Sequence, residues 1–84
     1  MQRTLIRDLD NFVGQQVKIQ GWAQTIRDQK RVQFIIVRDH TGIVQVVVGR
    51  SEENSDINDT ISSLAMESAV EIVGKVVENP RVRL

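Results

Sequence analysis

Alternating hydrophobic and polar positions run through most of the chain and predict β-strands. Successive side chains of a strand point to opposite faces, so this pattern indicates strands that are buried on one face. Four segments fit the pattern: residues 16–26, 32–38, 43–48 and 70–77. Gly21 indicates a bulge or a sharp coil that lets the first strand curl between two sheets, and Gly74 indicates a second bend.

One segment has the period of a helix instead. Its hydrophobic residues share one helical face at spacings i, i+4, i+7 and i+8: Ile57, Ile61, Leu64 and Ala65. Ser55 is a residue type that caps helix N-termini, and Asp56 follows it in the first turn, where the helix dipole favours an acid. Residues 1–15 predict a lead-in that docks on the core with its hydrophobic side chains and stops at Gly14.

The predicted order is β-β-β-α-β, and after Asn79-Pro80 a further alternation begins at Arg81. This order followed by a fifth strand is the Greek-key barrel called the OB-fold, so we expect residues 1–84 to form one all-β domain with one helix. The fifth strand lies between the third and fourth in that topology. Because only its first residues are present, we expect a truncated fifth strand in a fragment of a longer protein or in a barrel completed by another segment. Residues 43–48 and 70–77 would then be unpaired edges through which copies of the chain swap strands or associate.

Composition narrows the classes of function. A chain of 84 residues buries one small core, and the absence of cysteine excludes disulfide scaffolds and cysteine-ligated zinc. A single histidine excludes a two-histidine metal site. The longest apolar run has four residues, and no signal peptide is visible, so we expect a cytoplasmic domain without a membrane span. The sequence contains no phosphate-binding or hydrolase motif, which makes a stand-alone enzyme the weakest hypothesis.

Charge is distributed unevenly although basic and acidic residues number eleven each. Residues 16–50 carry six basic and two acidic side chains, a net +4, whereas residues 51–84 carry three and seven, a net −4. Arg27, Lys30 and Arg31 concentrate positive charge between the first two strands, where OB-folds bind phosphates. An ordinary solvated loop explains the same residues.

The turn from Asp39 to Gly42 sets the pairing of the second and third strands. If it closes a hairpin, Phe34 and Gln45 share one face as diagonal neighbours about 7–8 Å apart, and the other face is wholly aliphatic. An aromatic ring beside an amide offers stacking and edge hydrogen bonds to a nucleobase. The alternative is that Phe34 packs under the lead-in and Gln45 is only solvated.

Residues 17–48 resemble the N-terminal anticodon-binding domain of class IIb aminoacyl-tRNA synthetases, the aspartyl, asparaginyl and lysyl enzymes. The matching pieces are Gly21-Trp22, Ile26-Arg27-Asp28, Phe34-Ile35, Arg38-Asp39 and Gly42-Ile43-Val44-Gln45. The eleven-residue interval from Phe34 to Gln45 matches as well, and the resemblance continues to Pro80. Arg38-Asp39 before Thr41-Gly42 is most similar to the aspartyl enzymes.

The resemblance implies a role for individual residues. Phe34 would stack on the central anticodon uridine, Gln45 would hydrogen-bond that base, and Arg27 would help to hold the anticodon loop. The charge of the loop, and not the resemblance, suggests that Lys30 and Arg31 lie near the RNA backbone. In the family a glutamate on strand five recognises the first anticodon base, and no residue of this chain is assigned to that contact.

The resemblance also implies a parent enzyme, an aspartate–tRNA ligase that is a homodimer and uses ATP and Mg²⁺. Its catalytic domain lies outside this chain, so we expect the fragment to have no ligase activity and no cofactor or metal of its own. The alternative is a general single-stranded nucleic-acid module or an OB scaffold for protein contacts. A general binder has no need to hold Arg27, Phe34 and Gln45 at this spacing.

Overall fold

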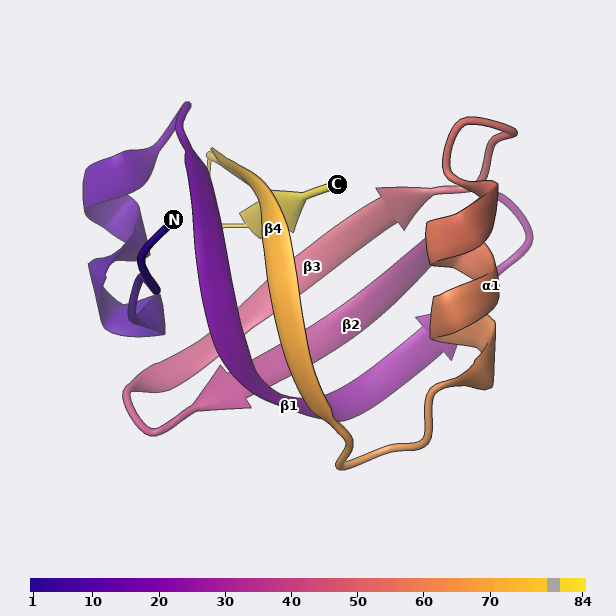
Figure 1. Ribbon diagram of the computed structural model, residues 1–84, viewed down its shortest axis with the longest axis horizontal. Coiled ribbons are helices and arrows are strands. Elements are labelled where there is room, and N and C mark those ends of the chain that lie inside the picture. Colours follow the sequence, from indigo (N-terminus) through magenta and orange to yellow (C-terminus); the bar gives the residue numbers. More distant parts are fainter. Residues whose placement is uncertain (79–80) are drawn as a thin grey trace.

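The computed structural model describes residues 1–78 and 81–84 and shows a closed five-stranded barrel (Figure 1). The elements are the 3-10 helix η1 (Ile6–Phe12), β1 (Gln16–Asp28), β2 (Val32–Asp39), β3 (Gly42–Gly49), α1 (Ser55–Ser63), β4 (Ala69–Val77) and β5 (Arg81–Arg83). The strands follow one another around the barrel as β1-β2-β3-β5-β4, and β4 pairs back onto β1. This order confirms the predicted OB-fold. Asn79 and Pro80 lie outside the described residues.

β1 contributes to both layers of the barrel. Residues 16–22 pair with β4 and residues 22–28 pair with β2, so the strand curls from one layer into the other (Figure 1). Gly21 lies where the partner changes, and a Cβ atom there would collide with the carbonyl oxygen of Arg38. The predicted curl is confirmed, but the bulge lies further along, because the register shifts between Ala23 and Thr25.

The core lies inside the barrel and is built from aliphatic side chains. The predicted core face of the hairpin is buried in full: Ile35, Val37, Val44, Val46 and Val48. Arg38 pairs with Ile43 and Ile36 with Gln45, which confirms the register that the turn predicts. Leu9 of η1 is also fully buried, so the lead-in docks on the core as expected.

The helix differs from its prediction at both ends. Asn54, and not Ser55, is the N-cap residue, and neither end of α1 is capped by a side-chain hydrogen bond. The helix ends before Leu64. Ile61 is buried, but Ile57 is 37% exposed, because the buried polar Asn58 turns toward the barrel in its place.

β5 closes the barrel with three residues, so the predicted unpaired edges are wrong along part of each strand. It pairs in parallel with residues 45–47 of β3 and antiparallel with residues 75–77 of β4. Val82 is fully buried between these neighbours. The glycine at position 74 permits this approach, since a Cβ atom there would lie 2.7 Å from the Val82 side chain and 2.9 Å from the Arg83 carbonyl oxygen.

A buried carboxylate ties η1 to the turn between β2 and β3. Asp39 accepts hydrogen bonds from the backbone N–H groups of Ile6 at 3.0 Å, Thr41 at 2.7 Å and Gly42 at 3.1 Å, and from the Thr41 hydroxyl at 2.6 Å. Burial by itself raises the pKa of Asp39. The hydrogen bonds outweigh burial and hold the pKa below its ordinary value of 3.8.

Replacing this acceptor is expected to destabilise the domain in a pH-dependent way. Asp39→Asn leaves buried N–H groups without an anionic acceptor and should lower the free energy of unfolding by about 1–3 kcal/mol at neutral pH. Because the pKa of Asp39 is lower in the folded protein than in the unfolded chain, ionised Asp39 stabilises the fold at pH values above the unfolded-state pKa. This stabilisation is lost as the pH falls through the folded-state pKa. Urea unfolding from pH 7 to pH 2 should therefore show the difference between the two proteins narrowing below pH 3.8. A constant difference over that range would contradict this role.

Candidate nucleic-acid interface

The bulge in β1 places Arg27 beside Phe34. Up to Ala23, odd-numbered residues of β1 point into the core, and an extra residue in a strand exchanges its two faces. Beyond the bulge, Arg27 pairs with Phe34 on the outer face, whereas Asp28 pairs with the buried Gln33 on the inner face. Three site residues predicted from the sequence thus lie on one surface, because Gln45 also faces outward.

The outer face of β2 and β3 is here called the recognition face, and it consists of Phe34, Ile36, Gln45 and Val47. Phe34 pairs with Val47 and Ile36 with Gln45, and all four side chains are half-buried. Phe34 does not belong to the hydrophobic core cluster or to the side chains packed against it. A ring and an amide are therefore available on this surface for a flat, polar-edged ligand such as a nucleobase.

Lys30 and Arg31 lie apart from the recognition face. They stand in the exposed loop 29–31 between β1 and β2 and have no strand partner on the barrel. The loop is short and its backbone is hydrogen-bonded, with Gln29 N–H donating to the Val32 carbonyl at 3.1 Å. Its two cations therefore lie in the loop that follows β1, outside the strands that form the recognition face.

Arg50 fixes this loop from the far end of β3. Its guanidinium donates to the Asp28 carboxylate and to the Gln29 carbonyl at 2.8 Å, and its backbone N–H donates to the Arg31 carbonyl at 3.1 Å. The Ser62 hydroxyl of α1 donates to the second oxygen of Asp28 at 2.7 Å. The charge of Arg50 is thus neutralised by Asp28, although Arg50 is one of the six basic residues that give residues 16–50 their net positive charge.

Two buried amides extend this network into the barrel. Gln33 Nε2 donates to Asp28 Oδ1 at 3.1 Å and to the Asn58 carbonyl at 3.0 Å, and Asn58 Nδ2 donates back to Gln33 Oε1 at 2.8 Å. Hydrogen bonds from Ser62, Arg50 and Gln33 hold the pKa of Asp28 below 3.8. α1 therefore supports the loop through side chains that are polar and satisfied.

Removing the contacts of Arg50 is expected to loosen the loop without unfolding the barrel. Arg50→Lys keeps the charge but cannot contact Asp28 and the Gln29 carbonyl with one planar group. Amide exchange at residues 29–32 should become several-fold faster, because an open loop exposes these groups, while exchange in β2 and β3 stays unchanged. Arg7→Lys, on η1, is the matched control. Equal exchange at residues 29–32 in Arg50→Lys and in wild type would show that Arg50 does not order the loop.

Pairing divides the basic side chains into two groups. Four of the eleven have a carboxylate within 4 Å: Arg3, Arg7, Lys18 and Arg50. Within residues 1–78 and 81–84, the other seven have none: Arg27, Lys30, Arg31, Arg38, Lys75, Arg81 and Arg83. Three of these seven, Lys75, Arg81 and Arg83, come from residues 51–84, the segment with net charge −4. The unpaired cations therefore do not follow from the charge of the segment in which they lie.

β5 adds two arginines that sequence reasoning missed. Arg81 pairs with Gln45 and Arg83 with Val47, and the residue between them, Val82, is fully buried. Both arginines therefore point outward on the side of the recognition face. The alternation Arg-Val-Arg was the available signal, but it assigns a face only when the place of β5 beside β3 is known.

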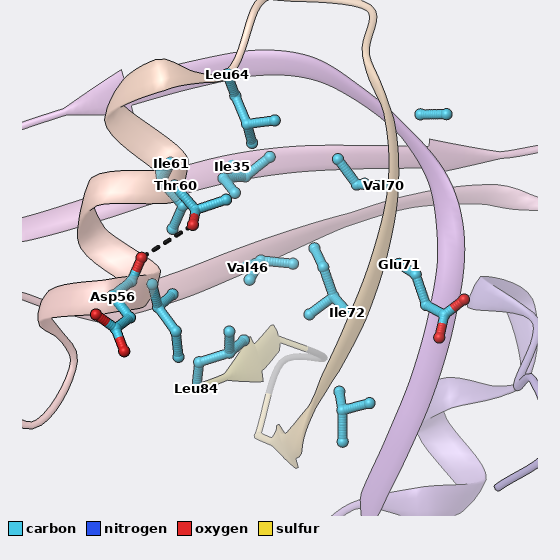
Figure 2. Close-up of a pocket in the computed structure, with 13 residues that line it drawn as sticks. Ile35, Val46, Asp56, Thr60, Ile61, Leu64, Val70, Glu71, Ile72 and Leu84 are labelled. Carbon is cyan, nitrogen blue, oxygen red and sulfur yellow. Dashed lines mark hydrogen bonds between the residues drawn. The ribbon is translucent and has the colours of Figure 1, made fainter.

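A cavity of about 510 Å³ lies elsewhere, between α1 and β4. Figure 2 shows Leu64, Val70, Ile72 and Leu84 around it, with Asp56 and Thr60 at its helical side. Its lining contains no aromatic ring and no cation, so it does not belong to the candidate interface. In the part of the chain that the structure describes, no three His, Asp or Glu side chains gather as metal ligands, and no helix is long and apolar enough to cross a bilayer.

Known proteins resemble the chain over nearly its whole length. Residues 17–84 match the tRNA anti-codon family, described as an OB-fold nucleic acid binding domain. The chain is 44% identical over 81 residues to the asparagine–tRNA ligase of Desulforamulus reducens, which covers 96% of this chain and 19% of the ligase. It is 39% identical over 79 residues to the aspartate–tRNA(Asp/Asn) ligase of Thermus thermophilus, which covers 94% of this chain and 16% of the ligase. The chain thus spans less than a fifth of these curated relatives.

A solved structure shows the same fold. The aspartyl tRNA synthetase from Entamoeba histolytica matches with a TM-score of 0.84 and 22% identity, over 99% of this chain and 20% of the synthetase chain.

Proposed function

Because the chain belongs to the tRNA anti-codon family of OB-fold nucleic acid binding domains, we propose that it recognises the anticodon loop of a tRNA. The observation that carries this proposal is the presence of Arg27, Phe34 and Gln45 side by side on one outer surface. A ring, an amide and a free guanidinium supply a stacking partner, an edge contact and a phosphate contact. We expect the anticodon loop to use all three contacts.

Each side chain contributes a different part of the recognition. Phe34 stacks on the central anticodon uridine, and this contact gives affinity for any base because every base has a π-face. The amide oxygen of Gln45 can accept from the N3–H of uridine while its NH₂ group donates to a uridine carbonyl oxygen, when the amide is turned accordingly. Arg27 binds a phosphate next to the stacked base. Lys30 and Arg31 attract the backbone from the loop end.

We infer further that the parent is an aspartate–tRNA ligase and that this chain is its anticodon-binding part. The similarity to ligases for asparagine and for aspartate supports the step that such enzymes share, the recognition of a tRNA. The Arg38-Asp39 pair before Thr41-Gly42 favours aspartate. In such a parent, which would be a cytoplasmic homodimer, ATP and Mg²⁺ belong to the catalytic domain, so the present chain contributes binding of tRNA and no chemical step.

Substituting the ring and the amide should have different consequences for base preference. Phe34→Ala should weaken binding by about 1–3 kcal/mol whichever base occupies the central position, the usual value of one base–aromatic stack. Gln45→Ala should reduce the preference for uridine over cytidine more than it reduces affinity. Titration of anticodon stem-loops with GUC and GCC measures both effects, with Val73→Ala, exposed on β4, as the control.

Two outcomes would count against base recognition by these residues. An unchanged uridine preference in Gln45→Ala, together with undiminished affinity in Phe34→Ala, would make both side chains structural. The chain would then be a general nucleic-acid module or a scaffold for protein contacts.

The basic loop should add a contribution that depends on salt. Each phosphate that a cation neutralises on a single strand changes the slope of log K against log salt by about 0.7. Lys30→Ala should therefore weaken binding of all stem-loops equally and reduce that slope by about this amount. Titrations between 50 and 300 mM salt test it, and a slope equal to that of the wild type would remove Lys30 from the interface.

A further inference from the structure

β5 extends the charged surface beyond the residues used so far. Arg81 lies one strand from Gln45, and Arg83 lies two strands from Phe34, with Val47 between them. Neighbouring strands are about 4.8 Å apart, so the Arg81 backbone is as close to Gln45 as the Ile36 backbone on the other side. The row Arg27, Phe34, Val47 and Arg83 thus crosses four strands and has an arginine at each end.

The charges of β5 are held without an acidic partner. Arg83 pairs directly with Lys75 of β4, and both side chains are exposed on the outer face. Like charges directly opposite each other destabilise a sheet. No carboxylate of the described residues comes within 4 Å of Lys75, Arg81 or Arg83. An uncompensated cluster of this kind attracts a polyanion.

We propose that Arg81 and Arg83 bind phosphates of the RNA backbone on the side of the recognition face opposite to Arg27. This inference rests on the proposed function, because it takes the RNA to be the strand whose base contacts Phe34 and Gln45. The bound nucleotides then lie across the sheet, with a base over the middle of the row and the backbone held at both ends. The guanidinium group suits this role, since it forms paired hydrogen bonds to phosphate oxygens.

Contacts of these two arginines with phosphates would add affinity without selecting a base. An arginine has five donors and no acceptor, so it matches phosphate oxygens. Because phosphate contacts carry no sequence information, the ratio of affinities for different anticodons should not depend on Arg81 or Arg83.

The test compares cations that differ in their place on the barrel. Arg81→Gln and Arg83→Gln are titrated with the GUC and GCC stem-loops at 50–300 mM salt, beside Arg7→Gln, which removes the same charge from η1. Each β5 variant should reduce the slope of log K against log salt by about 0.7 and leave the ratio of the two affinities unchanged. Arg7→Gln should match the wild type. Slopes equal to those of Arg7→Gln would overturn the proposal, as would a changed ratio of GUC to GCC.

A second measurement separates binding from folding. Removing one of two like charges should raise the melting temperature of Arg83→Gln at low salt, so weaker binding by a more stable variant is not explained by misfolding. If the slope falls in the β5 variants while Phe34→Ala and Gln45→Ala have no effect, β5 binds RNA and the proposed base recognition is wrong. If the Phe34 and Gln45 variants behave as expected and the β5 slopes do not change, only the β5 proposal fails. Weaker binding of a polyglutamate peptide without any change toward RNA would assign β5 to a protein partner and overturn the proposal.

Discussion

The register shift between Ala23 and Thr25 determines which side chains of β1 face outward, and both halves of the interface depend on it. Beyond the shift, Arg27 points out to Phe34, and Asp28 points in to Gln33. An unbulged strand would exchange the two faces, so that Arg27 would turn toward Gln33 and away from Phe34. The inward Asp28 in turn supplies the anion to which Arg50 and Ser62 attach the loop. One extra residue thus sets both the cation beside Phe34 and the acid that anchors the loop.

The charged side chains fall into those that are paired within the protein and those that can contact a ligand. Arg50 and Arg3 contact the carboxylates of Asp28 and Asp39, whose hydrogen bonds keep both pKa values low and both groups ionised near neutral pH. The unpaired cations lie on loop 29–31 and on the outer surface of the barrel, and four acids lie in or just before α1: Glu52, Glu53, Asp56 and Asp59. The unpaired cations are therefore the charges that are available to a polyanion.

The sequence is informative where the physics is local or periodic. The aliphatic alternation and the Asp39 turn predict the hairpin register correctly, because a slip by one residue would expose the whole core face. Other features depend on contacts between distant segments. The glycine at position 21 marks a close approach of two backbones, whereas the bulge falls at the ordinary residue Gln24. The pairing of Arg50 with Asp28 joins positions 22 residues apart, and the buried Asn58 has no hydrophobic signature. The place of β5 follows only from the closed barrel.

The place of β5 links ligand binding to the closure of the barrel. β5 lies between β3 and β4 and pairs with both strands. A ligand that contacts β3 and β5 together binds only the form in which these strands are paired, and it stabilises that form in proportion to its occupancy. Bound RNA would then act as a reversible cross-link between two strands that are distant in the sequence.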